Sequence, residues 1–201
     1  MRVDDDKLII EEILGGATDS FRILVERYQR LVVHIVFRLI PNPADREEIC
    51  QEIFIKVYQH LATFKFSSKM STWIGRIAFN TSMNHLRKEK MTLFDDCSSA
   101  VDKDHDRYTN HGPDNFQPDQ IKPDTFSENE ERYRIVQECV AGLPAPYRLI
   151  ITLFHLDELS YQEIAAITGQ PEGTIKSHLF RGRRLLKEKL VTEFRGEEIW
   201  T

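Results

Sequence analysis

Apolar residues recur at intervals of three and four along most of this chain, which is the spacing of one face of an α-helix. In the N-terminal half, this pattern predicts four helices, over residues 8–14, 21–39, 43–64 and 71–90. Asn42 is a good N-cap for the third helix, with Pro43 in its first turn, and Ser71 is a good N-cap for the fourth. No segment alternates apolar and polar residues as a half-buried strand would, so the sequence predicts an all-α fold.

A polar segment then interrupts the helical pattern. Residues 91–127 contain eight Asp or Glu, three Lys or Arg and three Pro, with few aliphatic residues and no periodicity. Such a composition is typical of a flexible linker. Helical spacing resumes over 128–143 and 146–157 and continues to residue 190. We therefore predict two small helical domains, residues 1–90 and 128–201, joined by a flexible acidic linker over 91–127.

The last two helices of the chain are predicted to form a helix-turn-helix. Ser160 and Glu163 form an S-x-x-E capping box, Gly169 suits a left-handed helix end, and Pro171 suits the start of a new helix. Residues 171–190 hold six Lys or Arg against two Glu. The face opposite the apolar one carries Lys176, Ser177, Phe180, Arg181 and Arg184. A basic second helix in this arrangement is typical of proteins that read duplex DNA.

A second basic segment covers residues 65–90, with six Lys or Arg against one Glu. On a helix, five of its residues share one stripe: Arg76, Asn80, Asn84, Arg87 and Lys88. Arg and Lys hold phosphates, while an Asn amide offers a donor and an acceptor to a base edge. Nearby aromatic residues suit the stacking of unpaired bases, although Trp73 is better explained as a core residue: Phe64, Phe66, Trp73 and Phe79.

The third predicted helix carries the opposite charge. Asp45, Glu48 and Glu52 follow one another at steps of three and four, with Gln51 beside them, on the side away from the apolar stripe. Such a stripe is either an ordinary solvated face or a surface that binds another protein.

The remaining composition excludes several classes of protein. The formal net charge is −5, so positive charge is local and the chain is no general nucleic-acid coat. The acidic N-terminus lacks the features of a signal peptide, and no apolar run is long enough to span a bilayer, so we expect a cytoplasmic protein without membrane insertion. The spacing of Cys97, His105 and His111 matches no usual zinc pattern, and no catalytic motif is present. We therefore expect no enzymatic activity, no metal and no cofactor.

Three segments in this order resemble the extracytoplasmic-function (ECF) group of the sigma-70 family of bacterial transcription initiation factors. The acidic helix, PADREEICQEIFIKVYQHL, resembles the family's polymerase-binding motif D-x-x-D-x-x-Q-E-x-F. The segment STWIGRIAFNTSMNHLRK resembles its promoter helix, T-W-L-x-R-I-A-x-N-x-x-x-(N/D)-x-x-R. The end of the chain resembles its helix-turn-helix domain, including the track P-x-G-T-(I/V)-K-S. His178 departs from the family, because many members have Arg there and would hold a phosphate with it.

This resemblance implies roles for individual residues. The acidic helix would dock on the clamp helices of the largest polymerase subunit through Asp45, Glu48, Gln51, Glu52 and Phe54. Asn80 would capture a base flipped from the minus-ten element, and the adjoining strand would be held by Arg76, Asn84, Arg87 and Lys88. The minus-thirty-five element would be read in the major groove by Lys176, Ser177, Phe180 and Arg181, with Thr174 and Arg184 on phosphates.

The partners implied are core RNA polymerase, through its clamp helices and the flap of its second-largest subunit, promoter DNA and an anti-sigma factor. One alternative is a regulator with a helical sensor domain and the same C-terminal reader, which would bind a palindrome as a dimer without polymerase. A second alternative is an enzyme with an attached DNA-binding module. The missing catalytic groups argue against the enzyme, and the paired basic and acidic helices of the N-terminal half argue against the sensor domain.

Overall fold

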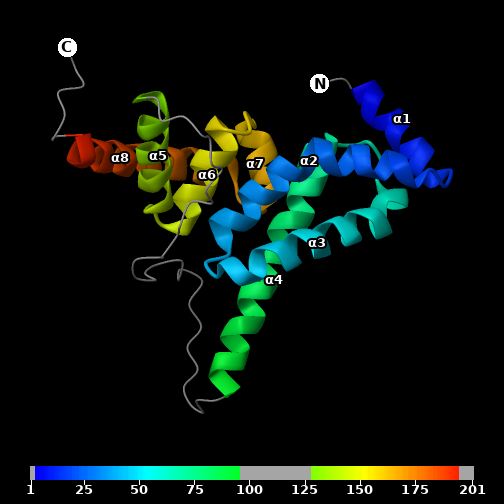
Figure 1. Cartoon of the computed structure of the whole chain (residues 1–201), viewed down its shortest axis with the longest axis horizontal. Helices are drawn as coiled ribbons and strands as arrows, with labels where there is room; N and C mark the ends of the chain where they lie inside the picture. Colours follow the sequence, from blue (N-terminus) through cyan, green and yellow to red (C-terminus); the bar gives the residue numbers. More distant parts are fainter. Residues whose placement is uncertain (1–2, 96–127, 195–201) are drawn as a thin grey trace.

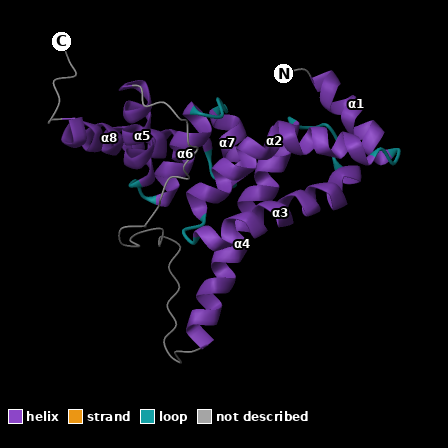
Figure 2. Cartoon of the chain, viewed as in Figure 1, coloured by secondary structure: helices purple, strands orange, loops and turns teal. Residues whose placement is uncertain are grey.

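The computed structural model describes residues 3–95 and 128–194, and every regular element within these ranges is helical (Figure 2). The sequence prediction of an all-α fold is therefore confirmed. In chain order, the elements are α1 (Val3–Leu14), α2 (Thr18–Leu39), α3 (Pro43–His60), the short 3₁₀ helix η1 (Leu61–Thr63), α4 (Met70–Asp95), α5 (Glu128–Ala141), α6 (Ala145–His155), α7 (Tyr161–Thr168) and α8 (Glu172–Phe194). Within the described ranges, no helix is both long and apolar enough to cross a membrane.

Two predicted boundaries around α4 are wrong. The helix begins at Met70, so Ser71 lies inside its first turn and is not its N-cap. The helix also continues to Asp95, so that residues 91–95, predicted as linker, are helical. The other linker residues, including Cys97, His105 and His111, lie outside the described residues.

α2 is the central helix of the structure and packs against α1, α3, α4 and α6. Its buried side chains follow the predicted period, from Leu24 through Ile35 to Leu39. Figure 1 shows α2 crossing the middle of the molecule, while the C-terminal half of α4 projects beyond the other helices. Polar contacts fix α1 on α2, because Asp6 accepts hydrogen bonds from Arg27 at 2.6 Å and from the Tyr28 hydroxyl at 2.7 Å.

The helices on either side of the linker pack on one another and share a single apolar core. α6 lies on α2, and α7 lies on α4. Gly75 of α4 permits the second contact, because a Cβ atom at this position would lie only 2.8 Å from Cδ1 of Ile167 in α7. Ile167 is fully buried there. The sequence predicts two domains but contains no signal for the contact between them.

The helix-turn-helix has the predicted capping. Ser160 Oγ accepts a hydrogen bond from the Glu163 amide at 3.2 Å, and the Ser160 amide donates to the Glu163 carboxylate at 2.8 Å. Gly169 ends α7 in the left-handed conformation with φ at +70°, where a side chain is disfavoured. Burial alone would raise the pKa of Glu163, but hydrogen bonds from Lys69 and Ser160 lower it overall. This stabilisation is therefore present at neutral pH and is lost as the pH falls through the folded pKa.

We predict that Ser160→Ala lowers the free energy of unfolding by about 0.5–2 kcal/mol, because it removes the side-chain acceptor at the start of α7. Urea denaturation followed by circular dichroism measures this change. Ser68→Ala, at an exposed serine in the loop before α4, is the matched control and is expected to change stability by less than about 0.5 kcal/mol. Equal stability of the Ser160 variant and the wild type would contradict the role of the cap.

Candidate functional site

The outer face of α8 is the first candidate surface, and the structure leaves it open to solvent. Lys176, Ser177, Arg181 and Arg184 are exposed, and Phe180 is 71% exposed although it is a large apolar residue. The opposite side of the helix packs inward as predicted, with Ile175 and Leu179 buried. Aromatic and arginine side chains are enriched at surfaces that bind other molecules. This face therefore has the composition of a binding surface rather than of an ordinary solvated one.

Thr174 and His178 are less accessible than the other residues near this face, and both are half-buried. Lys176 is exposed, and its ammonium group lies 5.5 Å from the ring centre of Tyr161 in α7. His178 packs inward with its ring edge-on to Tyr147 at 5.4 Å. Burial, together with the nearby positive charge of Arg181, lowers the pKa of His178. His178 is therefore a neutral residue that packs inside the domain, and it does not replace the phosphate-binding arginine that many family members have at this position.

The polar stripe of α4 is the second candidate surface. All of its predicted members are exposed: Arg76, Asn80, Asn84, Arg87 and Lys88. Arg76 and Asn80 line a cavity of about 500 Å³ whose opposite wall is α7 and its following turn, residues 165–171. The stripe is therefore open along most of its length and faced by the helix-turn-helix at its N-terminal end.

Of the four aromatic residues that the sequence placed near α4, only Phe66 offers an exposed ring. Phe64 is buried, and Trp73 and Phe79 are half-buried, which agrees with the prediction that Trp73 is a core residue. Phe66 is 42% exposed, with its ring centre 4.8 Å from that of Phe64, and its φ of +56° is unusual for a residue with a side chain. The loop before α4 thus holds one aromatic ring partly exposed near the start of this helix.

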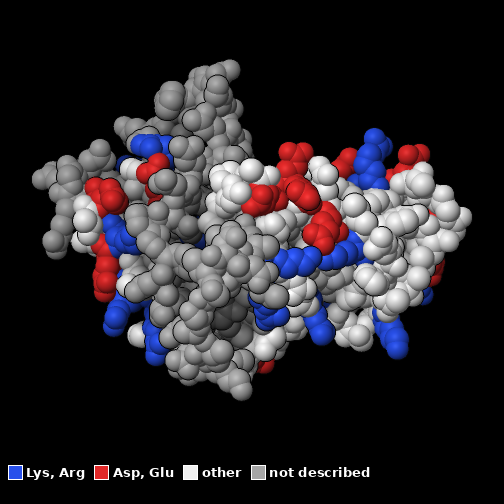
Figure 3. Space-filling model, turned by 90° about the horizontal axis from the view of Figure 1, so that it is seen from below, with Lys and Arg blue, Asp and Glu red and all other residues white. Residues whose placement is uncertain are grey.

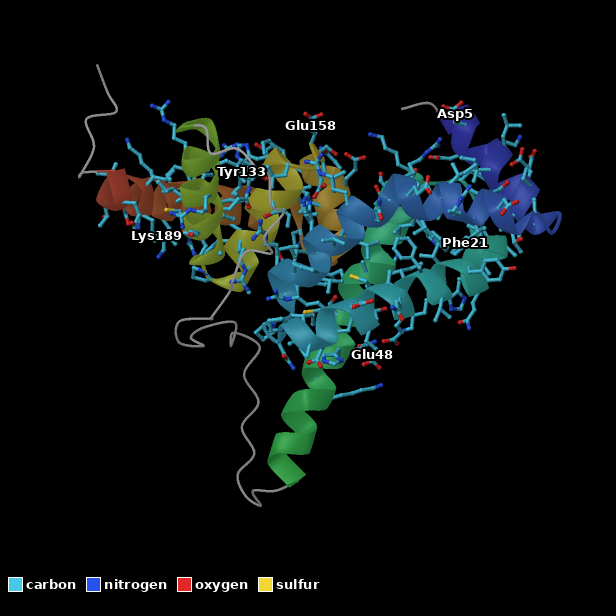
Figure 4. The ribbon with its side chains drawn as sticks, viewed as in Figure 1. Asp5, Phe21, Glu48, Tyr133, Glu158 and Lys189 are labelled. Atoms are coloured by element: carbon cyan, nitrogen blue, oxygen red, sulfur yellow. The ribbon has the colours of Figure 1, made fainter. Side chains whose placement is uncertain are left out.

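The acidic face of α3 is the third candidate surface. Glu48 lies on the outer edge of α3, away from α2 (Figure 4). Glu48, Gln51 and Glu52 are exposed, and Glu52 pairs with Lys56 at 2.7 Å. Asp45 differs from them, because it is half-buried, accepts a hydrogen bond from Asn42 at 2.8 Å and lies 3.6 Å from His85 of α4. Asp45 therefore also takes part in local structure.

An apolar groove of about 910 Å³ adjoins the acidic face, and the sequence did not predict it. Phe54 and Gln51 line it together with residues that were not predicted, among them Phe21, Ile55 and Tyr58. Ile55 is 56% and Tyr58 50% exposed, and the Tyr58 ring meets that of Phe21 edge-on at 5.0 Å. Residues of α2 and α3 form this groove jointly, so the periodicity of one helix does not reveal it. The exposure of Ile55 and Tyr58 marks a surface that a partner would cover.

Charge is mixed over the described surface rather than concentrated in one patch. In the view from below, Asp and Glu side chains lie in several separate groups, with Lys and Arg side chains between and beside them (Figure 3). Among the described residues, no cluster of His, Cys, Asp or Glu has the arrangement of a metal site. Burial, reinforced by the charge of Glu47, raises the pKa of Cys50 to about 11, so this thiol is unreactive at neutral pH. The arrangement of the described residues therefore suits binding by three surfaces.

Comparisons with known proteins match both halves of the chain. The family model "Sigma-70 region 2" matches residues 24–92, and the model "Sigma-70, region 4" matches residues 133–186. The chain is 35% identical over 185 residues to the ECF RNA polymerase sigma-E factor of Escherichia coli, which covers 92% of this chain and 94% of the relative. It is 31% identical over 181 residues to the ECF RNA polymerase sigma factor SigW of Bacillus subtilis, and this match covers 90% of this chain and 94% of that relative.

Solved structures share the fold. The sigma factor RpoE from Bartonella quintana, in complex with the anti-sigma factor NepR, superposes with a TM-score of 0.62 at 20% identity, covering 86% of this chain and 98% of that one. CnrH, in complex with the cytosolic domain of CnrY, superposes with a TM-score of 0.59 at 16% identity, and the superposition covers 93% of this chain and 97% of that one. At these identities the superpositions establish the fold alone.

Proposed function

The chain belongs to the ECF group of the sigma-70 family and is a transcription initiation factor, and on this premise we propose a binding partner for each of its three exposed surfaces. Residues 1–95, which include the whole of α4, bind core RNA polymerase and the minus-ten element, residues 128–201 read the minus-thirty-five element, and residues 96–127 connect the two parts. The observation that carries the proposal is that three chemically different faces, one acidic and two basic, are all exposed on separate helices.

The acidic face of α3 is proposed to dock on the clamp helices of the largest polymerase subunit. Glu48, Gln51 and Glu52 supply charge and hydrogen-bonding groups, while Phe54 continues into the apolar groove. An interface with an apolar centre and a charged rim suits specific protein association. Tyr58 and Ile55 would fill the centre, and the carboxylates would steer the approach. Asp45 contributes at the edge, where it accepts a hydrogen bond from Asn42 and lies close to His85.

The stripe of α4 is proposed to hold the unpaired minus-ten strand. Arg76, Arg87 and Lys88 would contact phosphates, and Asn80 and Asn84 would meet base edges with their amides. A base taken out of the stack exposes donors and acceptors that need new partners, which Asn80 can provide. Phe66 adds an exposed ring on which a base can stack.

The exposed face of α8 is proposed to enter the major groove at the minus-thirty-five element. Lys176, Ser177, Phe180 and Arg181 lie at the centre of this face, with Thr174 and Arg184 at its edges toward phosphates. Further proposed contacts are the flap of the second-largest polymerase subunit and an anti-sigma factor. The anti-sigma partner is proposed because one structure with this fold is a complex with the anti-sigma factor NepR. The chain itself is proposed to have no enzymatic activity.

We predict that Glu48→Lys combined with Glu52→Lys abolishes co-purification with core polymerase, because reversing charges at a complementary interface costs about 2–5 kcal/mol or more. Circular dichroism is expected to remain helical, since both residues are exposed. The matched control is Glu11→Lys with Glu26→Lys, which changes the net charge equally on exposed parts of α1 and α2. Retained binding by the α3 double variant would refute the docking surface.

Arg181→Ala is expected to lower transcription from a cognate promoter, because a groove contact is worth about 1–3 kcal/mol. Lys176→Ala is expected to act in the same direction. The control, Arg183→Ala, alters an arginine of the same helix that faces α6, where it lies over the Phe154 ring at 5.1 Å. In vitro transcription measures all three variants. If only the Arg183 variant lost activity, the reading face would lie on the other side of α8.

Asn80→Ala is predicted to preserve or raise thermal stability, because Asn80 is exposed and Ala is the better helix former by up to about 0.7 kcal/mol. Polymerase binding is expected to persist, whereas strand opening at a cognate promoter is expected to fall. A template that is already unpaired over the minus-ten element is expected to restore activity only partly. Permanganate footprinting of thymines on duplex and pre-melted templates separates these effects, and normal opening would show that Asn80 reads no base.

A further inference from the structure

One carboxylate lies among the cations of the face that α8 is proposed to turn toward DNA. Glu172 begins α8, one helical turn before Lys176, and its Oε2 lies 3.9 Å from Nζ of Lys176. The same oxygen accepts a hydrogen bond of 3.2 Å from the side-chain amide of Gln162 in α7. A negative charge at this position opposes the approach of DNA phosphates, so attraction to the DNA backbone does not account for it.

Structural roles account for little of this arrangement. The ion pair is exposed, with 41% of the Glu172 side chain and 58% of the Lys176 side chain open to solvent, and such a pair adds little stability. A carboxylate in the first turn favours a helix start, but this effect does not require a lysine beside it. Both contacts of Glu172 use Oε2, so within the described part of the chain Oε1 is left to accept a hydrogen bond from a ligand.

The backbone next to Glu172 is bare. A Cβ atom at Gly173 would meet no atom within 4 Å, and the φ of this residue is not positive, so neither packing nor conformation requires a glycine here. Glycine is a poor helix former, and its presence at an open helical position suits a close approach from outside the chain. In a helix-turn-helix, this end of the second helix is the one that contacts base edges.

The ammonium of Lys176 and the carboxylate of Glu172 form a donor and an acceptor at a spacing that suits one base pair. On its major-groove edge, a G·C pair offers the acceptors N7 and O6 of guanine, followed by the N4 amino donor of cytosine. O6 and N4 are joined by a hydrogen bond of the base pair, so they lie about 2.9 Å apart. With 3.9 Å between their charged atoms, Lys176 can donate to guanine while Glu172 accepts from cytosine, after only small side-chain rotations.

The order of the two groups also distinguishes the two DNA strands. If the base pair is inverted to C·G, Lys176 faces the amino group of cytosine and Glu172 faces the guanine acceptors, so both contacts become repulsive. A T·A pair keeps the order of acceptor and donor, but it offers the lysine one acceptor in place of two. Lysine alone does not impose this order, because its flexible side chain carries donors only.

We infer that Glu172 is a specificity-determining residue of the α8 reading face, whose carboxylate accepts a hydrogen bond from N4 of the cytosine paired with the guanine that Lys176 binds. This inference rests on the proposed role of α8 and goes further by naming one base pair and its orientation. Lys176 selects the guanine, and Glu172 fixes the strand on which that guanine lies. Gln162 is a positioning residue, because it holds the carboxylate from α7.

Binding of the holoenzyme to a promoter library tests the inference. The full-length chain, reconstituted with core RNA polymerase, selects from duplexes that are randomised over both promoter elements. Sequencing of the bound fraction gives the base preference at each position for the wild type, Glu172→Gln, Glu172→Ala and Lys176→Ala. The matched control is Glu188→Gln, because Glu188 forms a second exposed ion pair on α8, with Arg184 at 3.6 Å.

We expect the wild type to favour G·C over C·G at one position by about fivefold or more, with T·A between them. Glu172→Ala is expected to lose this strand preference at that position alone, Glu172→Gln to weaken it, and Lys176→Ala to lose the preference for guanine there. Because Glu172→Ala removes a negative charge, its total affinity for the library is expected to stay equal or to rise. The Glu188 variant is expected to match the wild type at every position. A loss of total affinity that affects all positions equally would assign Glu172 a structural role and overturn the inference.

A change of one chemical group in the DNA tests the same contact directly. In a selected duplex, the cytosine is replaced by 2-pyrimidinone, which lacks the N4 amino group, and fluorescence anisotropy measures binding of the holoenzyme to both duplexes. The replacement is expected to weaken binding of the wild type by about fivefold or more and to leave binding of Glu172→Ala unchanged. Equal weakening of both proteins would show that Glu172 does not contact this amino group, and the inference would be overturned.

The lysine variant separates this inference from the proposed function. If Lys176→Ala changes the preference at one position and the Glu172 variants change none, α8 reads the element without Glu172, and the inference alone is overturned. If neither Lys176→Ala nor the Glu172 variants change any position, the assignment of α8 to the minus-thirty-five element falls as well.

Discussion

The placement of the helix-turn-helix depends on one absent side chain, at Gly75. Because α4 has no Cβ at this position, Ile167 approaches its backbone and is fully buried between the two domains. A larger residue at this position would meet the Ile167 side chain, so that either this side chain or α7 would have to shift. The buried core is continuous across the domains through this contact. A single close approach between two helices therefore determines which parts of α4 remain open to a ligand.

The second half of the interface depends on buried arginines as well as on apolar packing. Arg148 is 3% exposed and donates to the Arg38 carbonyl and to the Ala141 carbonyl, so its guanidinium bonds the ends of two helices. Guanidinium groups buried this way need well-aligned acceptors, which makes the contact specific in geometry. The same desolvation limits how much stability the contact adds. The contact between α2 and α6 is thus well defined in position.

The sequence predicts the features that depend on neighbours in the chain and misses those that depend on distant ones. Helical period, the Ser160 capping box, the Gly169 helix end and the exposed stripes of α4 and α8 were all predicted, because each follows from residues within a few turns of one another. The burial of Arg38 was not, because an arginine in an amphipathic helix ordinarily faces solvent.

In the candidate surfaces, too, the features set by neighbouring residues were predicted and those set by distant residues were missed. The charged residues of α3 were identified from their spacing, whereas the groove beside them was missed because Phe21 comes from α2 and Ile55 and Tyr58 from α3. Asp45 was grouped with the exposed carboxylates, and its contact with His85 depends on the packing of α3 against α4. The spacing of the linker residues also gave no information on where α4 ends, because the helix continues to Asp95 beyond the last apolar repeat.

The charge of the chain bears on how its two basic faces can work. A formal net charge of −5 opposes approach to DNA, and each basic face offers only a few cations, so neither alone provides the phosphate contacts that strong binding needs. On the proposed function, this weakness is corrected by attachment to polymerase, which raises the effective concentration of each face at its element. Weak separate faces then favour specificity, because a site that satisfies only one of them is released quickly. An acidic body with two small basic faces thus suits a subunit that reads DNA only as part of a larger assembly.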